Sequence, residues 1–319
     1  MNRPSTIGCT LVSLLVVFVL SGVIVGLSFT AIQHAREAAN RSACKNNLKQ
    51  HAFGFENHQD QRGDATPLAL FNRGLSWSVL SIPYLEGWGG FARLRLEETF
   101  EEQQNQRALH PMGQCYLYHC YSRRRTPQWT NELVAGDYAV PSIGVVASNN
   151  PTRDDTWMQA HDPKENLGPF LVVWRTKPLK FGPAPPKGMT MLNPAAGYHS
   201  QTSSASWLDG EAHQIILGEK ALHPDHLNTE GQGGDFTIGA WIENDFNASD
   251  CTRNGAAALV RSAYEDYHGQ WSRFGSWHPN ICQFAYADGR VEPMNNDVSR
   301  SVLYELCHRG SAKTSALSP

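Results

Sequence analysis

The longest hydrophobic segment lies near the N-terminus, where residues 11–32 form an almost unbroken apolar run. No Asp, Glu, Lys or Arg occurs between Arg3 and Arg36. At 1.5 Å per residue this run makes a helix about 33 Å long, which is enough to cross the hydrocarbon core of a bilayer. The alternative, a cleaved secretory signal, has a shorter apolar region that ends at a small-residue cleavage site. The run therefore predicts a transmembrane helix over residues 9–33.

The residues that follow this run become polar but keep a helical pattern. Apolar side chains recur on one face at a spacing near 3.6 residues, at Ala31, Ala35, Ala38, Ala39, Cys44, Leu48, Ala52 and Phe55. This periodicity predicts that one helix continues from Thr10 to about His58, a length of about 73 Å. Gly63 and Pro67 mark its end. Residues 34–60 are thus expected to form a stalk with one face available to a globular domain.

Beyond residue 60 the pattern changes to short apolar runs separated by Gly, Pro and Asn, which is typical of strands and loops. Two such runs lie at 171–174 and 214–219. A third, at 281–287, is followed by Asp288-Gly289 and a second strand. We expect a hairpin with a type I′ turn there, because Asp and Gly both tolerate positive φ. In the first strand one face carries Cys282, Phe284 and Tyr286, and the other carries Ile281, Gln283 and Ala285.

The last helical pattern lies at residues 298–308. Apolar residues recur there at Val298, Val302, Leu303 and Leu306, before Gly310. We expect a short C-terminal helix that packs on the sheet, and then a flexible tail over residues 311–319. Together these patterns predict an α+β fold, with a long N-terminal transmembrane and stalk helix packed on a mainly antiparallel β-sheet ectodomain of residues 61–310.

Charge and motif content limit the function classes. Lys and Arg total 27 against 30 for Asp and Glu, a net charge of −3, so no basic field is present to hold nucleic acid. Hydrophobic residues make up 41% of the chain, which is sufficient for a packed core. The chain has no Gly-x-Ser-x-Gly, His-Glu-x-x-His, P-loop or dinucleotide glycine motif. We therefore expect a protein that is not an enzyme.

The first residues resemble those of type IV prepilins. MNRPSTIG followed by CTLVSLLVV has their short basic leader, a Gly and then an apolar helix. The resemblance implies that residues 1–8 are a leader, that a prepilin peptidase cuts between Gly8 and Cys9, and that Cys9 becomes a methylated terminus. It further implies a single-pass protein of the inner (cytoplasmic) membrane, with a cytoplasmic N-terminus and a C-terminal domain that is periplasmic or extracellular. Its partners would be the membrane and other pilin-like subunits.

Two positions depart from the prepilin pattern. Cys9 replaces the usual Phe at the first mature position. Ser13 stands where most pilins carry a Glu five residues into the mature chain. In the family this carboxylate is thought to meet the N-terminus of a neighbouring subunit during assembly, in a low dielectric. The tip subunit of type II secretion pseudopili also lacks this Glu. The departure at Ser13 argues against a place in the filament shaft, and it leaves open a minor or tip position or an uncleaved protein that keeps its anchor.

Six later segments stand out in order along the chain: AREAANRSACKNNLKQ at 35–50, LSWSVLSIPYLE at 75–86, LEETFEEQQNQRALH at 96–110, CYLYHCYSR at 115–123, LDGEAHQIILGE at 208–219 and HPNICQFAYADGR at 278–290. Together they resemble the planctomycete DUF1559 family of prepilin-like proteins, which has a C-terminal His-x9-Asp-Gly motif. The resemblance implies a strand at 75–86 and an acidic helix at 96–110. The resemblance indicates the fold but not the biochemical activity, because the family has no known function.

His278, Asp288 and Gly289 form the family motif, and two interpretations of it compete. An acid–base pair would need His278 and Asp288 side by side. However, ten steps of extended chain at about 3.3 Å place them about 33 Å apart along a straight strand. We therefore interpret the motif as structural, with Asp288 forming the turn and His278 capping the start of the strand beside Pro279.

Six Cys lie outside the membrane segment, at Cys44, Cys115, Cys120, Cys251, Cys282 and Cys307. An even number of cysteines on the oxidising side of a membrane is typical of disulfide bonds, and six cysteines can pair completely in 15 ways. We favour Cys44 with Cys120, because this bond would tie the stalk to the sheet and stabilise the fold by about 3 to 5 kcal/mol. Free buried thiols are the alternative.

A candidate metal site lies in a Gly-rich loop that contains His223, Asp225, His226 and Asp235. Imidazole and carboxylate groups are metal ligands, and calcium is one candidate because some pseudopilins hold it in a late loop. The spacing is loose, so a solvated loop without a cofactor is the default expectation.

These observations lead to two function hypotheses. The first is a non-enzymatic, prepilin-like or pseudopilin-like component of a surface or secretion filament, in a minor or tip position. The second is a membrane-tethered module that binds a solute or carbohydrate, does not polymerise, and has its ligand contacts within residues 221–272.

Overall fold

The computed structural model describes most of the chain. The described residues are 11–70, 76–85, 116–123, 129–130, 133–143, 167–173, 200, 202–227, 236–238, 241–242, 245–246, 251–265 and 272–310. The helices are α1 (Leu11–Arg62), α2 (Trp77–Leu80) and α6 (Arg300–Cys307), with short 3-10 turns η1 (Ile82–Tyr84), η4 (Tyr116–Tyr118), η5 (Ser204–Ser206), η6 (Glu211–His213) and η7 (Pro224–His226). The strands are β1 (Ala69–Leu70), β2 (Trp129–Thr130), β3 (Leu133–Ala135), β4 (Tyr138–Ser142), β5 (Val172–Val173), β6 (Ile215–Glu219), β7 (Phe236–Ile238), β8 (Trp241–Ile242), β9 (Asp245–Phe246), β10 (Thr252–Asn254), β11 (Ile281–Tyr286) and β12 (Val291–Asn295).

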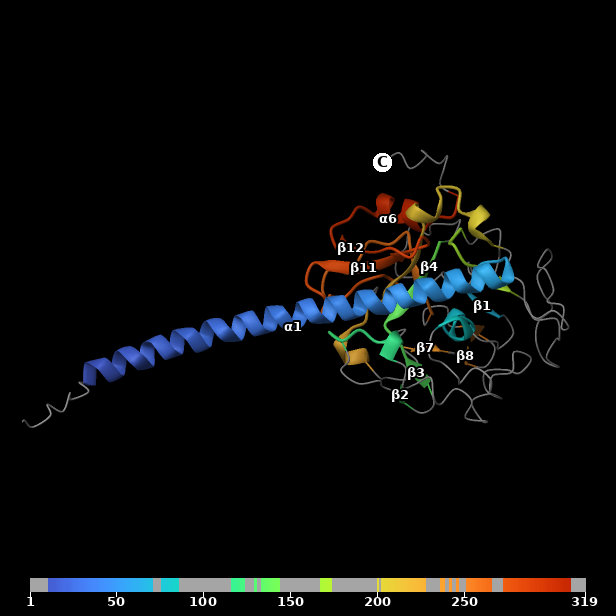
Figure 1. Ribbon diagram of the computed structural model, residues 1–319. Helices are drawn as coiled ribbons and strands as arrows, with labels where there is room; N and C mark the ends of the chain where they lie inside the picture. The colour runs from blue at the N-terminus through green and yellow to red at the C-terminus, as the bar shows by residue number, and fades with distance from the viewer. Residues whose placement is uncertain are drawn as a thin grey trace, which may run out of the picture.

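Helix α1 is one continuous element of 52 residues. Its first half projects away from the rest of the molecule, and its second half crosses the globular part formed by the residues after α1, here called the head (Figure 1). The projecting half exposes its large apolar side chains from Val12 to Ile32, and α1 is long and apolar enough to cross a membrane. The helix ends four residues later than the predicted His58, where Gly63 takes a φ of +78° and donates its N–H to the Gln59 carbonyl at 2.7 Å.

The main sheet has five strands in the order β10-β4-β6-β11-β12. Strands β10 and β4 are parallel, and the other three pairings are antiparallel. Two smaller sheets pair β1 with β5 and β8 with β9, and a third has β3 between β2 and β7. The α+β class is confirmed. The main sheet is mixed, because β10 and β4 are parallel, and the sequence pattern carried no sign of this pair.

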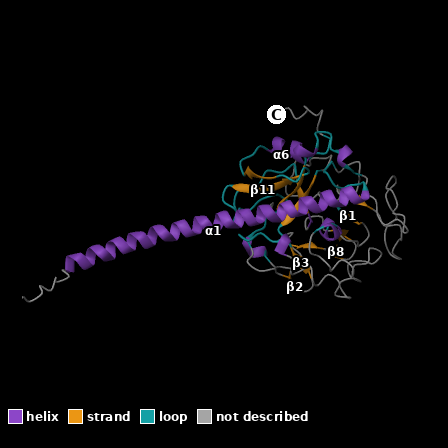
Figure 2. Ribbon diagram, in the orientation of Figure 1, coloured by secondary structure: helices purple, strands orange, loops and turns teal. Residues whose placement is uncertain are grey.

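Both faces of the main sheet are covered. On one face Leu48, Ala52 and Phe55 of α1 belong to the same apolar cluster as Leu217 and Ala285. On the other face Cys282, Phe284, Tyr286, Leu303 and Cys307 form a second cluster, in which α6 packs on β11. The predicted alternation along β11 and the short C-terminal helix are therefore confirmed, and the sheet lies between α1 and α6. Figure 2 shows the long helix running across the head and α6 at its edge.

Two local predictions are corrected. The family resemblance implied a strand at 75–86, but the described part, residues 76–85, forms α2 and η1 instead, with Pro83 in η1 and Trp77 buried. The β11–β12 hairpin is present, but its turn is not type I′. Among the residues of that turn only Gly289 has a positive φ, at +78°, and Gly289 donates its N–H to the Tyr286 carbonyl at 3.1 Å. The Tyr286 N–H donates to the Arg290 carbonyl at 2.8 Å, which leaves a loop of three residues, 287–289, with one left-handed glycine, and so Asp288 needs no positive φ.

Candidate functional site

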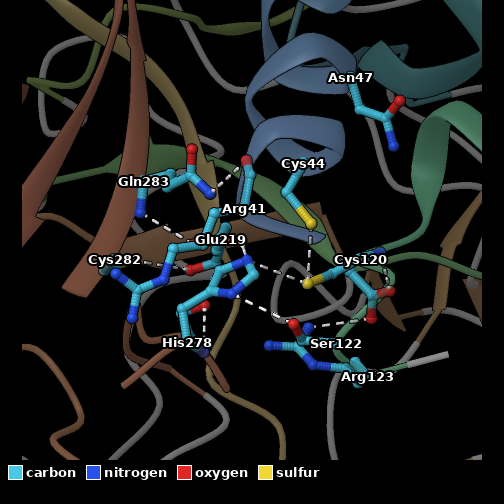
Figure 3. A network of polar contacts seen from close by, with 12 residues as sticks. Arg41, Cys44, Asn47, Cys120, Ser122, Arg123, Glu219, His278, Cys282 and Gln283 are labelled. Atoms are coloured by element: carbon cyan, nitrogen blue, oxygen red, sulfur yellow. Dashed lines mark hydrogen bonds and ion pairs between the residues drawn. The ribbon is translucent and has the colours of Figure 1, made fainter. Parts of the chain in front are cut away.

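Four potential ligand atoms converge under α1 from four separate parts of the chain. They belong to Cys44 on α1, Cys120 after η4, Glu219 at the end of β6 and His278 before β11. All four residues are buried, and one thiol, carboxylate or imidazole atom from each lies within 4.8 Å of the others. Figure 3 shows these side chains pointing toward one another. This cluster is the densest set of chemically reactive groups in the described part of the chain.

Helix α1 positions the segment that carries Cys120. The amide of Asn47 donates hydrogen bonds to the carbonyls of Tyr116 and His119, at 3.1 and 3.0 Å. One turn further along α1, Nε2 of His51 lies 3.0 Å from the Leu117 carbonyl. Spacings of three and four residues place these side chains on the same face as Cys44. The stalk thus binds the backbone of η4 with polar side chains, and this brings the Cys44 and Cys120 thiols together.

A buried ion pair holds the other side of Cys120. Asp137 accepts a hydrogen bond from the Cys120 N–H at 2.6 Å through one oxygen, and from Arg123 Nη1 at 2.9 Å through the other. Arg123 also donates to the Lys220 carbonyl at 2.5 Å. The Arg123 and Asp137 side chains are fully buried. Because each charge needs its partner in this low dielectric, the turn at Cys120 is fixed in position.

Glu219 presents one carboxylate oxygen to the cluster. Its Oε2 accepts a hydrogen bond from the Gln283 N–H at 2.8 Å, next to the β6–β11 pairing. Its Oε1 is buried, has no hydrogen-bond partner, and lies 3.3 Å from His278 Nε2. A buried carboxylate oxygen without a hydrogen bond is costly unless a cation faces it.

His278 lies between two carboxylates. Its Nδ1 is 2.6 Å from Glu37 Oε1 and 3.2 Å from the Ser122 hydroxyl, while its Nε2 is 3.6 Å from Cys120 Sγ. Burial alone would lower the pKa of His278, but its contacts with Cys120 and with the Glu219 carboxylate raise it to about 11. In the arrangement shown, the ring is thus an imidazolium.

Glu37 is fixed by three donors. Burial would raise the pKa of its carboxyl, but hydrogen bonds from His278, Arg41 and Ser122 lower it below the usual value. Arg41 Nε donates at 3.0 Å and Ser122 Oγ at 2.9 Å. Glu37 is therefore a charged carboxylate that orients the His278 ring from the stalk.

A thiol, an imidazole and a carboxylate in a row also suggest a catalytic nucleophile, namely Cys120 activated by His278 with Glu37 behind it. Two observations oppose this. The hydrogen bond from Cys44 and burial raise the pKa of Cys120 well above its usual value, so the thiol is protonated. The Cys120 and His278 side chains are also inaccessible to a substrate. These buried groups are better placed to bond to one another, or to hold an ion, than to act on a substrate.

Comparison with protein-family models matches residues 33–300 to the family described as "Protein of unknown function (DUF1559)". This match covers most of the chain, from the membrane-proximal part of α1 to the first residue of α6. The chain belongs to the DUF1559 family. No curated protein and no solved structure matches it.

Both ends of the DUF1559 motif contact α1, and they lie far apart. His278 meets Glu37, whereas a Cβ added at Gly289 would lie 3.2 Å from the ring of Phe53, sixteen residues further along the helix. His278 and Asp288 flank opposite ends of β11, as expected from the length of the strand. Asp288 accepts a hydrogen bond from the Arg290 N–H at 3.0 Å, a turn role. His278 has a different role from the predicted cap, because its ring enters the buried cluster.

The predicted Cys44–Cys120 pair is adjacent. The Cys44 thiol donates to Cys120, with the sulfurs 3.0 Å apart, and both cysteines are free thiols in this structure. The disulfide therefore stays a prediction. Cys282 and Cys307 are also free thiols, and these two and Cys251 are buried. The predicted processing residues Gly8 and Cys9, together with Cys115, lie outside the described residues.

The loop proposed from sequence as a metal site is only partly described, because Asp235 lies outside the described residues. His223 Nδ1 accepts the Asp225 N–H at 3.2 Å as the cap of η7, and the rings of His223 and His226 pack at 5.9 Å. Among the described residues, the group of potential ligands is instead Cys44, Cys120, Glu219 and His278. The loop site stays a prediction.

Sequence analysis missed Glu37 and Glu219. The one signal for Glu219 was its place directly after the apolar run 215–218, but a Glu is rarely buried unless it is paired, and the sequence does not show its partner. Glu37 gave no signal, because a charged residue on a stalk helix is usually solvated. Its partner His278 is 241 residues away.

Proposed function

We propose that this DUF1559 protein is a membrane-anchored, prepilin-like subunit of a surface or secretion filament, and that it has no enzymatic activity. One observation carries the proposal: α1 runs without a break for 52 residues from an exposed apolar half into the core of the head. Such a helix can anchor the chain in lipid, and can then pack against the same half of a neighbouring subunit. A flexible linker would not transmit the position of the anchor to the head.

The buried contacts of the head support a rigid connection. Cys44, Asn47 and His51 fix η4, and Leu48, Ala52 and Phe55 lie in the apolar cluster beneath α1. Ser13 in place of the usual Glu favours a minor or tip position. In this proposal the N-terminus is cytoplasmic, the head lies outside the inner membrane, and a prepilin peptidase removes residues 1–8.

The test is the mature N-terminus of the full chain, measured by mass spectrometry on protein taken from native membranes. We expect a chain that begins at a methylated Cys9, and we expect Gly8→Val to remain uncut and to be absent from sheared filaments. Gly22→Val is a matched control for the cleavage step alone: it should be cut like the wild type, because a side chain at Gly22 would meet no atom of this chain within 4 Å. An intact Met1 in the wild-type chain would contradict the proposal and would favour a permanent tether.

The alternative, a tethered ligand-binding module, has weaker support. A cavity of about 110 Å³ lies beside the end of α1, lined by Phe55, Asp60, Phe170, Trp207 and other residues. Pockets for drug-sized ligands measure about 300–1,000 Å³. This cavity has room for a few waters or a very small ligand, so the filament hypothesis takes precedence.

A further inference from the structure

We propose that Cys44, Cys120, Glu219 and His278 bind one Zn²⁺ ion in a buried structural site. The ion would join α1, the turn after η4, the end of β6 and the start of β11 at a single point. All four ligand atoms already lie within 4.8 Å of one another in the described structure (Figure 3). This inference does not depend on whether the chain assembles into a filament.

Two of the distances between donor atoms match the edges of a zinc tetrahedron, and all the others lie within 4.8 Å. Ligands at about 2.3 Å for sulfur and about 2.0–2.1 Å for nitrogen and oxygen give edges of about 3.5 Å from N to S, about 3.3 Å from N to O and about 3.8 Å from S to S. The His278–Cys120 distance is 3.6 Å and the His278–Glu219 distance is 3.3 Å. The two sulfurs, at 3.0 Å, must move apart by less than 1 Å. Two thiolates repel each other, so ionisation of the two thiols would move the sulfurs apart.

The surroundings of the donors fit a metal site equally well. Glu219 uses Oε2 for the Gln283 N–H and leaves Oε1 without a hydrogen bond, which suits a single carboxylate ligand. His278 presents Nε2 to the cluster while its Nδ1 faces Glu37 at 2.6 Å. A carboxylate behind the ring is the usual partner of a histidine that ligates a metal, because it fixes the ring orientation and raises the basicity of the ligand.

The donor types select the metal. Two thiolates and an imidazole favour Zn²⁺ over Ca²⁺ or Mg²⁺, which prefer oxygen ligands throughout. Four protein ligands complete a tetrahedron, which is typical of structural zinc. On binding, the Cys44 and Cys120 thiols and the His278 imidazolium each release one proton to solvent, and the ion forms bonds to two thiolates, one imidazole and one carboxylate.

The predicted disulfide competes for the same sulfurs. A Cys44–Cys120 bond would remove both thiolates, so oxidised protein cannot hold the ion at this site. The two states are therefore distinguishable in protein whose free thiols are trapped during extraction from membranes.

The test uses the full-length chain, solubilised in detergent and purified without chelators. We expect about one zinc per chain by plasma mass spectrometry. After zinc removal under reducing conditions, Co²⁺ should give a thiolate charge-transfer band and the strong visible bands of a tetrahedral site. Cys44→Ser and Cys120→Ser should each weaken Co²⁺ binding at least 100-fold and lower the charge-transfer band, because one of two thiolate ligands is lost, and the double variant should lose the band. Cys307→Ser is the matched control, because this thiol is equally buried but lies in the cluster beneath α6.

Glu37→Gln tests the outer partner and should weaken binding by about 10- to 100-fold. The wild-type cobalt spectrum reports the thiolate ligands even if a cysteine variant fails to fold. The proposal is overturned by a trapped Cys44–Cys120 disulfide in protein from native membranes, by wild-type protein that binds no stoichiometric metal, or by Co²⁺ spectra without a thiolate band.

Discussion

His278 Nδ1 lies 2.6 Å from Glu37 Oε1, although 241 residues separate them in the sequence. This contact joins the first residue of the DUF1559 motif to the stalk. At the other end of the motif, Gly289 approaches Phe53 of the same helix. The motif thus holds a β-hairpin along α1 at two points about 24 Å apart on the helix axis. The motif therefore attaches the β11–β12 hairpin to α1.

The first prediction concerns the Glu37 contact. Glu37→Ala should lower the free energy of unfolding of the full chain in detergent by about 1–3 kcal/mol, because the buried His278 ring loses its charged partner. Glu56→Ala, on an exposed position of the same helix, is the control and should change it by less than about 0.5 kcal/mol. Urea unfolding followed by circular dichroism gives both values. Equal effects of the two substitutions would show that the contact contributes nothing.

The second prediction separates backbone strain from contact at the turn. Gly289 and Gly63 both have a φ of +78°, but an added Cβ would lie 3.2 Å from Phe53 at Gly289 and would meet nothing within 4 Å at Gly63. Gly63→Ala should destabilise by about 1–2 kcal/mol from strain alone. Gly289→Ala should cost more, and Phe53→Ala should remove the excess. If Gly63→Ala is the more damaging change, the hairpin does not rest on α1 as described.

Much of the architecture could be predicted from sequence, because it depends on local pattern. The apolar stripe through Cys44, Leu48, Ala52 and Phe55 gave the buried face of α1, and period-two alternation gave the two faces of β11. The candidate site could be predicted only in parts. Cys44, Cys120 and His278 were each singled out, but for a disulfide and a strand cap. Nothing local indicates that Glu219 and Glu37 meet them, since that depends on long-range packing.

The third prediction compares a buried ion pair with an exposed one. Arg123 and Asp137 are 2.9 Å apart and fully buried, whereas Arg261 and Asp297 are 3.1 Å apart with about three quarters of each side chain exposed. Asp137→Ala should destabilise by about 3–5 kcal/mol, because it leaves the guanidinium charge buried without its partner. Asp297→Ala should cost less than about 1 kcal/mol, because water screens that pair. Thermal unfolding of the two variants, measured side by side, would contradict this if the shifts were similar.

The last prediction concerns acid. Burial lowers the pKa of His51 to about 4, partly offset by its hydrogen bond to the Leu117 carbonyl. Burial and the charge of Arg62 lower the pKa of His58 to about 4. In the unfolded chain both pKa values are near 6.5. Between about pH 6.5 and 4 the unfolded state therefore binds more protons than the folded state, so the free energy of unfolding falls as the pH is lowered.

The expected slope from these two histidines is up to about 1.4 kcal/mol per pH unit each, and their contribution is fully present above about pH 6.5. His51→Gln keeps a donor for the Leu117 carbonyl. It should lower the slope by up to about 1.4 kcal/mol per pH unit, the contribution of one proton. His213→Gln, on an exposed side chain, is the control and should leave the slope nearly unchanged. The measurement is a series of urea unfolding curves from pH 7 to 4. A slope that His51→Gln leaves unaltered would mean that this ring is already protonated in the folded protein, which its buried contacts with Trp77 and Tyr118 oppose.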